Sequence, residues 1–124
     1  MLDHVSVPVS DYERSKRFYV AALSPLGYEL IKEPSVSAAG FGGLGKPDFW
    51  ISQGEPGQAL HIAFAADERA TVDAFREAAM VAGGRDNGGP GLRPEYHASY
   101  YGAFVFDPDG NNIEAVCHGP EQEA

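Results

Sequence analysis

The sequence is poor in cysteine, in basic residues and in long apolar runs, and each shortage excludes a class of protein. Its single cysteine, Cys117, has no partner for a disulfide bond within the chain, which favours a reducing compartment. There are 9 Lys and Arg against 18 Asp and Glu, and the formal net charge of -9 repels nucleic acids and anionic membranes. No run approaches the roughly 18 apolar residues of a membrane span. Residues 1–9 contain no basic region followed by an apolar stretch, so we expect no secretion signal and a cytoplasmic protein.

What the sequence does contain is the composition of an ordinary folded domain. Hydrophobic residues make up 44% of its 124 residues and charged residues 22%, which supports one packed core and excludes a disordered chain. A chain of this length suits a single domain, which we expect to span residues 1–124.

The first half of the chain has the pattern of a strand, a helix and about three further strands. The valine-rich segment 2–9 leads to Ser10 and Glu13, whose spacing predicts a reciprocal capping box at the start of a helix. Apolar residues recur on one face of this helix, and Gly27 ends it. Segments separated by glycines are expected to form strands joined by tight turns; they are 28–32, 35–41 and 47–53.

The same order restarts in the second half. Segment 60–66 predicts a strand, and Asp67 is expected to cap a helix over about 69–82. The glycine-rich segment 83–91 is expected to be a flexible connection. Two last strands are expected around the turn at 107–110, over 100–106 and 112–117.

Equivalent residues of the two halves lie at one constant separation in the sequence. The pairs are His4 and His61, Phe18 and Phe75, and Gly27 and Gly84. A strand residue, a helix residue and the glycine that ends the helix therefore all repeat. The simplest explanation is two copies of one module, the first over about 1–56 and the second over about 57–118.

Alternation along the strands separates a packed face from an open one. The valines of the first strand share a face that is expected to pack under a helix, whereas His4 lies on the other face. His61 likewise alternates with the large apolar residues of its strand. In the last strand Glu114 and Cys117 point to different faces of the sheet. Cys117 is on the face that packs under the helix, so we expect it to be a buried, inert thiol. A glutamate in the middle of an apolar strand is costly unless it is exposed, paired or bound to a metal.

Three segments carry a resemblance to a known superfamily: Asp3-His4-Val5-Ser6-Val7, Leu60-His61-Ile62-Ala63-Phe64, and the stretch 106–114 with its Asp-Pro-Asp-Gly turn and Glu114. In this order, on a doubled frame, they resemble the vicinal-oxygen-chelate superfamily of glyoxalases, bleomycin-resistance proteins and extradiol dioxygenases. The resemblance covers nearly the whole chain. It implies an α+β fold in which two tandem βαβββ modules form a curved, cup-shaped mixed sheet with the helices outside.

The resemblance also implies a metal site formed by His4, His61 and Glu114. Two imidazoles and one carboxylate suit a divalent Fe, Mn, Zn or Ni ion and leave positions for a substrate that chelates through two oxygens. A lyase or isomerase of the glyoxalase type, or a ring-cleaving dioxygenase, is therefore expected. Ser52 stands where the glyoxalase I branch carries a fourth ligand, and its hydroxyl is a poor ligand, which argues against that particular activity.

Relatives in this superfamily complete their cups either within one chain or across a dimer, so the resemblance implies a homodimer and leaves the location of the triad open. Elsewhere, the segment 93–101 combines three tyrosines with a histidine. His97 is a candidate general acid or base, and Tyr100 and Tyr101 are candidates to hydrogen-bond a substrate oxygen.

The sequence also leaves a second class of function open, that of a binding protein. Trp50 and Ser52 are expected to line the cup together with Tyr101, and aromatic residues in an acidic protein also suit a cationic aromatic ligand. A metal-free binding protein of the bleomycin-resistance type is therefore the alternative to a metal enzyme.

Overall fold

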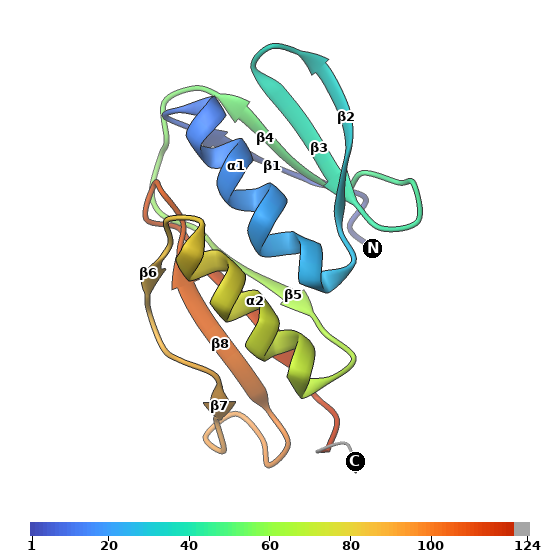
Figure 1. Ribbon diagram of the computed structural model, residues 1–124, viewed down its shortest axis with the longest axis vertical. Helices are drawn as coiled ribbons and strands as arrows, with labels where there is room; N and C mark the ends of the chain where they lie inside the picture. The colour runs from blue at the N-terminus through green and yellow to red at the C-terminus, as the bar shows by residue number, and fades with distance from the viewer. Residues whose placement is uncertain (121–124) are drawn as a thin grey trace.

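The computed structural model describes residues 1–120 and shows two helices on one side of two mixed sheets (Figure 1). In chain order the elements are β1 (Val5–Val9), α1 (Tyr12–Leu23), the 3-10 helix η1 (Ser24–Leu26), β2 (Glu29–Ser35), β3 (Ala38–Gly42), β4 (Phe49–Gln53), β5 (His61–Ala65), α2 (Arg69–Val81), β6 (Arg85–Asp86), β7 (Gly91–Leu92), β8 (Tyr101–Phe106) and β9 (Asn112–Cys117). No helix within residues 1–120 has the length and apolar character needed to cross a membrane.

The two sheets repeat one topology. The first has the strand order β1-β4-β3-β2, and the second has the order β5-β9-β8-β6 with β7 also paired to β8. In each sheet the first strand of the module pairs in parallel with the last strand, β1 with β4 and β5 with β9. This confirms the predicted α+β fold of two tandem modules. The two sheets are separate and do not close into one barrel.

One core runs through both modules beneath the paired helices. The predicted helix-facing residues Val7 and Val9 of β1 are buried. The ring of Phe49 on β4 lies 4.9 Å from that of Tyr19 on α1 and 5.4 Å from that of Phe64 on β5. Burial of one such aromatic side chain stabilises the fold by about 1.5–3 kcal/mol. The chain of rings therefore packs the first module against the second.

Asp107, in the turn after β8, connects the second module to α1. Its side chain is 1% exposed and accepts hydrogen bonds from the Tyr19 hydroxyl and from the backbone N–H groups of Asp109 and Asn111. Burial, followed by the nearby Asp107 charge, raises the pKa of Tyr19 well above its ordinary value. The Tyr19 hydroxyl therefore stays protonated and donates to the carboxylate.

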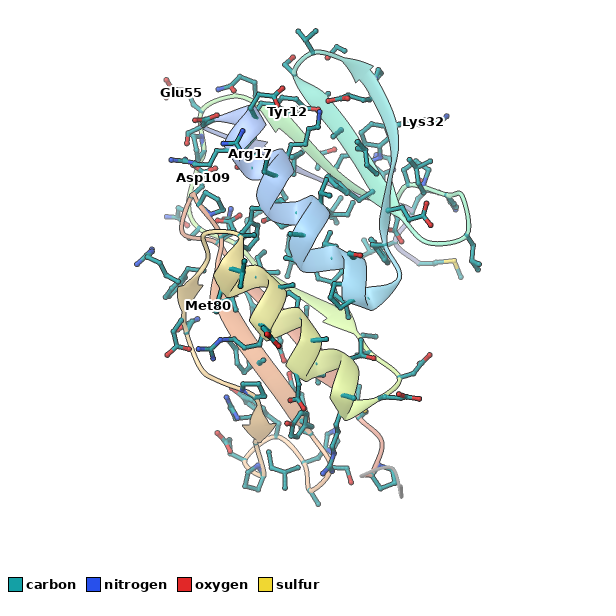
Figure 2. The ribbon with its side chains drawn as sticks, viewed as in Figure 1. Tyr12, Arg17, Lys32, Glu55, Met80 and Asp109 are labelled. Carbon is teal, nitrogen blue, oxygen red and sulfur yellow. The ribbon has the colours of Figure 1, made fainter. Side chains whose placement is uncertain are left out.

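The two predicted helix caps are wrong by one residue each. Asp11, not Ser10, caps α1, and its carboxylate accepts from the Arg14 backbone N–H at 3.2 Å. The hydroxyl of Ser10 donates instead to Asp109, which lies beside the first turn of α1 (Figure 2). At α2 the N-cap is Glu68 rather than Asp67, and its side chain makes no capping bond.

The segment 83–91 is also more ordered than predicted, because it contains β6 and the first residue of β7. Arg85 pairs with Phe106 and Gly91 with Gly102, so both short strands extend the second sheet from β8. Strands of two residues show no apolar alternation, which is why the pattern suggested a flexible connection.

Candidate functional site

The side of the second sheet that faces away from α2 carries the predicted chemistry, and we call it the open face. The strand register places these residues on it: His61, Ala63, Ala65, Gly102, Phe104, Glu114 and Val116. The alternating residues Ile113 and Ala115 belong to the core on the other side, as the pleat of a strand requires.

His61 and Glu114 form the centre of the open face. His61 Nε2 lies 2.8 Å from Glu114 Oε1 across the parallel pair β5 and β9. The Glu114 side chain is 1% exposed, whereas the His61 side chain is 53% exposed. A buried carboxylate is stable only when its oxygens have partners, so His61 offsets part of the cost of burying Glu114.

Tyr100 supplies the second partner of Glu114. Its hydroxyl donates to Glu114 Oε2, and burial together with this hydrogen bond raises the pKa of Tyr100 above its ordinary value. Gly102 leaves the space for this contact, because a Cβ there would lie 3.3 Å from Glu114 Oε2 and 3.2 Å from the Tyr100 ring. Both carboxylate oxygens are thus engaged, one by an imidazole and one by a phenol.

Phe104 and Arg93 complete the surroundings of the pair. The Phe104 ring lies 6.1 Å from the His61 ring, and the Arg93 guanidinium lies 5.4 Å from the Phe104 ring centre. Arg93 also donates to the Gly89 carbonyl at 2.8 Å, which holds its guanidinium over that ring. Sequence reasoning missed Phe104, although its alternation along β8 relative to the core residue Val105 was a usable signal. It also missed Gly102, for which the sequence carries no signal.

The third predicted ligand, His4, lies elsewhere in this chain. Its Nδ1 atom is 2.8 Å from Asp3 Oδ1, and its side chain is 54% exposed. Within residues 1–120, no group of three or more His, Cys, Asp or Glu side chains lies close enough to hold a metal ion. One chain therefore brings together two of the three predicted ligands, His61 and Glu114.

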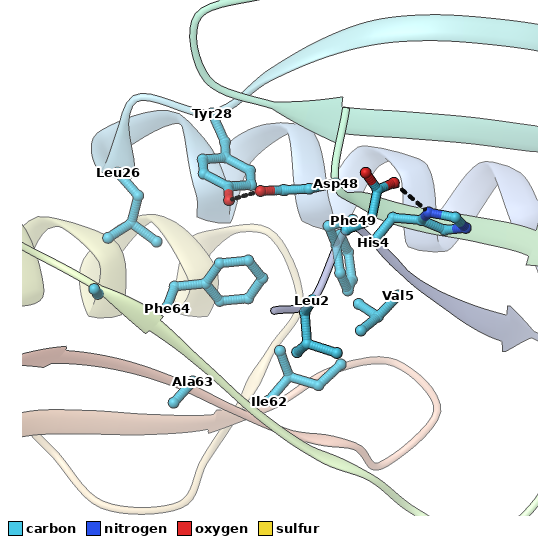
Figure 3. A pocket seen from close by; sticks show the side chains of 12 residues that line it. Leu2, His4, Val5, Leu26, Tyr28, Asp48, Phe49, Ile62, Ala63 and Phe64 are labelled. Carbon is cyan, nitrogen blue, oxygen red and sulfur yellow. Dashed lines mark hydrogen bonds and ion pairs between the residues drawn. The ribbon is translucent and has the colours of Figure 1, made fainter. Parts of the chain in front are cut away.

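His4 instead borders a cavity of about 300 Å³ between the two modules (Figure 3). Aromatic rings of Tyr28, Phe49 and Phe64 line it. The Tyr28 hydroxyl donates to Asp48 Oδ2 at 2.9 Å, and burial with this hydrogen bond raises the pKa of Tyr28 to about 12. Aromatic walls beside a carboxylate suit a small apolar or cationic molecule.

The other predicted cup residues lie on different surfaces. The Tyr101 hydroxyl donates to Asp73 on α2 at 2.6 Å, and the Arg69 guanidinium lies 5.1 Å from its ring, so Tyr101 faces the helix rather than Glu114. Trp50 and Ser52 lie on the first sheet, where the Trp50 ring covers Gly40 so closely that a Cβ there would be 2.8 Å away.

His97 lies next to Tyr100 rather than next to Glu114. Its ring is 5.4 Å from the Tyr100 ring in an edge-on arrangement, and its Nε2 atom is 2.9 Å from His118 Nδ1. The exposed Tyr96 ring also packs against the Tyr100 ring, with the ring centres 4.8 Å apart. The tyrosine-rich segment therefore surrounds the one tyrosine that reaches Glu114.

Comparisons with known proteins agree with this architecture. The family model described as Glyoxalase/Bleomycin resistance protein/Dioxygenase superfamily matches residues 1–115. A glyoxalase/bleomycin resistance protein from Albidiferax ferrireducens T118 has 31% identity and a TM-score of 0.81, over 96% of this chain and 99% of that one. A putative glyoxalase from Bacillus halodurans has 26% identity and a TM-score of 0.71, over 94% and 95% of the two chains.

A glyoxalase I mutant from Zea mays has 25% identity and a TM-score of 0.69, over 93% of this chain and 46% of the maize chain. A comparison with curated protein sequences gives no match.

Proposed function

This chain belongs to the Glyoxalase/Bleomycin resistance protein/Dioxygenase superfamily, and from that premise we propose that it is a divalent-metal-dependent enzyme. Its substrate is a small molecule that presents two oxygens to the metal, and its reaction is of the lyase, isomerase or dioxygenase type. The observation that carries the proposal is the contact of 2.8 Å between His61 and the buried carboxylate of Glu114.

The donor set on the open face fits a divalent transition metal. His61 offers an imidazole nitrogen and Glu114 a carboxylate, which are ligands that Fe, Mn, Zn and Ni all accept. Bound there, such an ion supplies Lewis-acid polarisation of a substrate oxygen. Tyr100 donates to the second oxygen of Glu114 and so holds the carboxylate in a fixed orientation, as partners of metal ligands commonly do.

The third ligand in this proposal is His4 of the partner subunit in a two-fold homodimer. Two observations support it: His4 does not join His61 and Glu114 within one chain, and both histidines are about half exposed on their surfaces. In a symmetric dimer the first module of one subunit can complete the open face of the other, which produces two equivalent sites.

The remaining side chains supply binding and proton transfer. Phe104 and Arg93 form the floor beside the pair, and the Tyr100 hydroxyl, which donates its proton to Glu114, can accept a hydrogen bond from a substrate hydroxyl. His97 contacts Tyr100 and is the candidate to hold or move a proton at its ring nitrogen. A reducing cytoplasm is part of the same proposal, because Cys117 is a buried free thiol.

The cavity beside His4 favours a second candidate function, a metal-free binding protein. Its walls combine the rings of Phe49 and Phe64 with the carboxylate of Asp48, a combination that suits a cationic aromatic molecule. In that case the protein acts by sequestering its ligand, and the His61–Glu114 contact is only a structural ion pair.

Metal content separates the two candidates. The wild type, His61→Ala and the control Tyr28→Phe are purified without an affinity tag or chelator, and elemental analysis measures the metal in each. We expect the metal content of wild type and of Tyr28→Phe to exceed that of His61→Ala by about one ion per chain, the stoichiometry of one ligand set. If His61→Ala holds as much metal as wild type after reconstitution with Fe(II), Mn(II) or Zn(II), or if neither protein holds any, the enzyme proposal is rejected in favour of the binding protein.

A further inference from the structure

His97 and His118 form a second histidine pair, separate from His61 and Glu114. His97 lies in the turn before β8 and His118 directly follows β9. Their rings are nearly parallel, with an interplanar angle of 26° and centres 5.2 Å apart, and both side chains are exposed. Neither residue contacts His61 or Glu114 directly; Tyr100 lies between the two pairs.

Local contacts hold both rings in place. The Ser99 backbone N–H donates to His97 Nδ1 at 3.1 Å, and the Tyr100 N–H donates to the His97 carbonyl at 3.2 Å. The Tyr100 ring packs edge-on against both imidazoles, at 5.4 Å from each. The two histidines are thus brought together by the fold before any ligand binds, which lowers the entropic cost of binding.

One ring nitrogen of His97 faces one ring nitrogen of His118, and the hydrogen bonds of His97 show which of these nitrogens carries the proton. Because His97 Nδ1 accepts from Ser99, the hydrogen of the neutral His97 ring is on Nε2 and points to His118 Nδ1. Two ring nitrogens therefore share a single proton across 2.9 Å. A metal ion with affinity for imidazole can replace that proton.

The separation of the nitrogens matches one class of metal geometry. Adjacent ligands at right angles, with metal–nitrogen bonds of about 2.0–2.1 Å, lie about 2.9 Å apart. The observed distance between His97 Nε2 and His118 Nδ1 is also 2.9 Å. Tetrahedral sites place ligands farther apart, so tetragonal or octahedral Ni(II) and Cu(II) fit better than Zn(II). The hydrogen bond directs the two nitrogens at each other, so each ring must turn to direct its lone pair to a shared ion, and the exposure of both side chains leaves room for that turn.

We propose that His97 and His118 form a second site for a transition metal ion such as Ni(II) or Cu(II), with water completing its coordination. The net charge of -9 draws cations to the protein surface. Occupancy ties the turn that carries Tyr100 to the end of β9, and thereby fixes the residue that contacts Glu114. The site shares no metal ligand with the open face, but its occupancy engages His97, so His97 cannot bind this ion and transfer a proton at the same time.

Calorimetric titration with Ni(II) tests the site in the His61→Ala variant, which lacks the ligand pair of the open face. We expect one Ni(II) per chain in His61→Ala. Adding His118→Gln is expected to weaken this affinity by about 100-fold, since one of two tethered ligands is lost. The matched control adds His4→Gln, which also removes an exposed histidine and is expected to leave the affinity unchanged.

Two results would overturn the site: His61→Ala that binds no Ni(II), or an affinity that His118→Gln does not change. In case His61→Ala does not fold, the same comparison is made in wild type, where His118→Gln must lower the Ni(II) stoichiometry by one. A failed enzyme proposal gives a different result, namely a wild type with one ion per chain and a titration that His61→Ala does not alter.

Discussion

At Glu114 two polar side chains meet on a carboxylate that has almost no contact with water. His61 engages one oxygen and Tyr100 the other, so each partner removes part of the penalty of burying the charge. Alternation along the strand was enough to place Glu114 and His61 on one face, because the pleat of a sheet fixes that side. It did not predict the Tyr100 contact, since the path of the irregular segment before β8 carries no period.

Removing the Tyr100 hydroxyl tests the importance of that contact. Tyr100→Phe leaves Glu114 Oε2 without its donor in a nearly unexposed position, so the free energy of unfolding of the metal-free protein should fall by about 1–3 kcal/mol. Urea denaturation measures the change. The control Tyr96→Phe alters a side chain whose residue is 61% exposed and should stay within about 0.5 kcal/mol of wild type. Equal effects of the two variants would refute the structural role of the Tyr100 hydroxyl.

A second prediction for a single residue concerns Gly102. The Cβ atom that Gly102→Ala adds would lie 3.2 Å from the Tyr100 ring and 3.3 Å from Glu114 Oε2. We expect the Tyr100–Glu114 contact to be displaced, with a loss of about 1–3 kcal/mol in the free energy of unfolding and weaker metal binding. Gly119→Ala, where a Cβ would have no neighbour within 4 Å, is the matched control. A Gly102→Ala variant with wild-type stability and metal affinity would show that this space is not needed.

At the scale of elements, sequence patterns located α1, α2 and the longer strands but not their detailed ends. The cap prediction at α1 failed because Ser10 and Asp11 both have capping side chains, and the choice between them depends on a distant partner. Asp109 takes the Ser10 hydroxyl, which leaves Asp11 to cap α1. The short strands β6 and β7 were missed for a related reason: they exist because β8 offers an edge, and not because of a pattern of their own.

The contact between α1 and β2 leads to a prediction about how the stability of the fold depends on pH. Glu33 on β2 accepts from Lys16 at 2.6 Å and from the Tyr12 hydroxyl, and these hydrogen bonds hold the pKa of Glu33 below its ordinary value of 4.5. A carboxyl with a lowered pKa stabilises the fold above that ordinary value, and the contribution is lost as the pH falls through the pKa of the folded state.

Urea unfolding of wild type and Glu33→Gln across pH measures this contribution. Glu33→Gln should be slightly less stable than wild type near about pH 7, and the difference should disappear as the pH falls through the lowered pKa of Glu33 in the folded state, where the carboxyl becomes protonated. Glu29→Gln, an exposed residue of the same strand, controls for the loss of one negative charge. A stability difference that persists unchanged at low pH would contradict the assignment.

At the scale of the whole molecule, the internal repeat predicted the doubled topology, and both sheets follow it. What the repeat could not predict is the placement of His4 relative to His61. That placement depends on how the two sheets pack against each other, which no local pattern records. In this chain His4 pairs with Asp3 and lies beside the cavity between the modules.

A subunit-mixing experiment tests whether the metal site is shared between subunits. His4→Ala and His61→Ala homodimers should each lack the metal of the open face, because every such site in them misses one ligand. Refolding the two variants together should restore metal to mixed dimers, since one of their two sites combines an intact His4 with an intact His61. Mixed dimers without metal would place the complete ligand set within one chain, and a monomeric protein would exclude sharing altogether.

The proposed activity depends on a metal ion bound by His61 and Glu114. Anomalous diffraction from crystals of the metal-loaded protein locates that ion directly. We predict a peak about 2.0–2.2 Å from both His61 Nε2 and a carboxylate oxygen of Glu114. The contrary result would be crystals that contain the metal but show no peak beside His61 and Glu114, with the contact between these residues still at 2.8 Å. That result would contradict the proposed metal site.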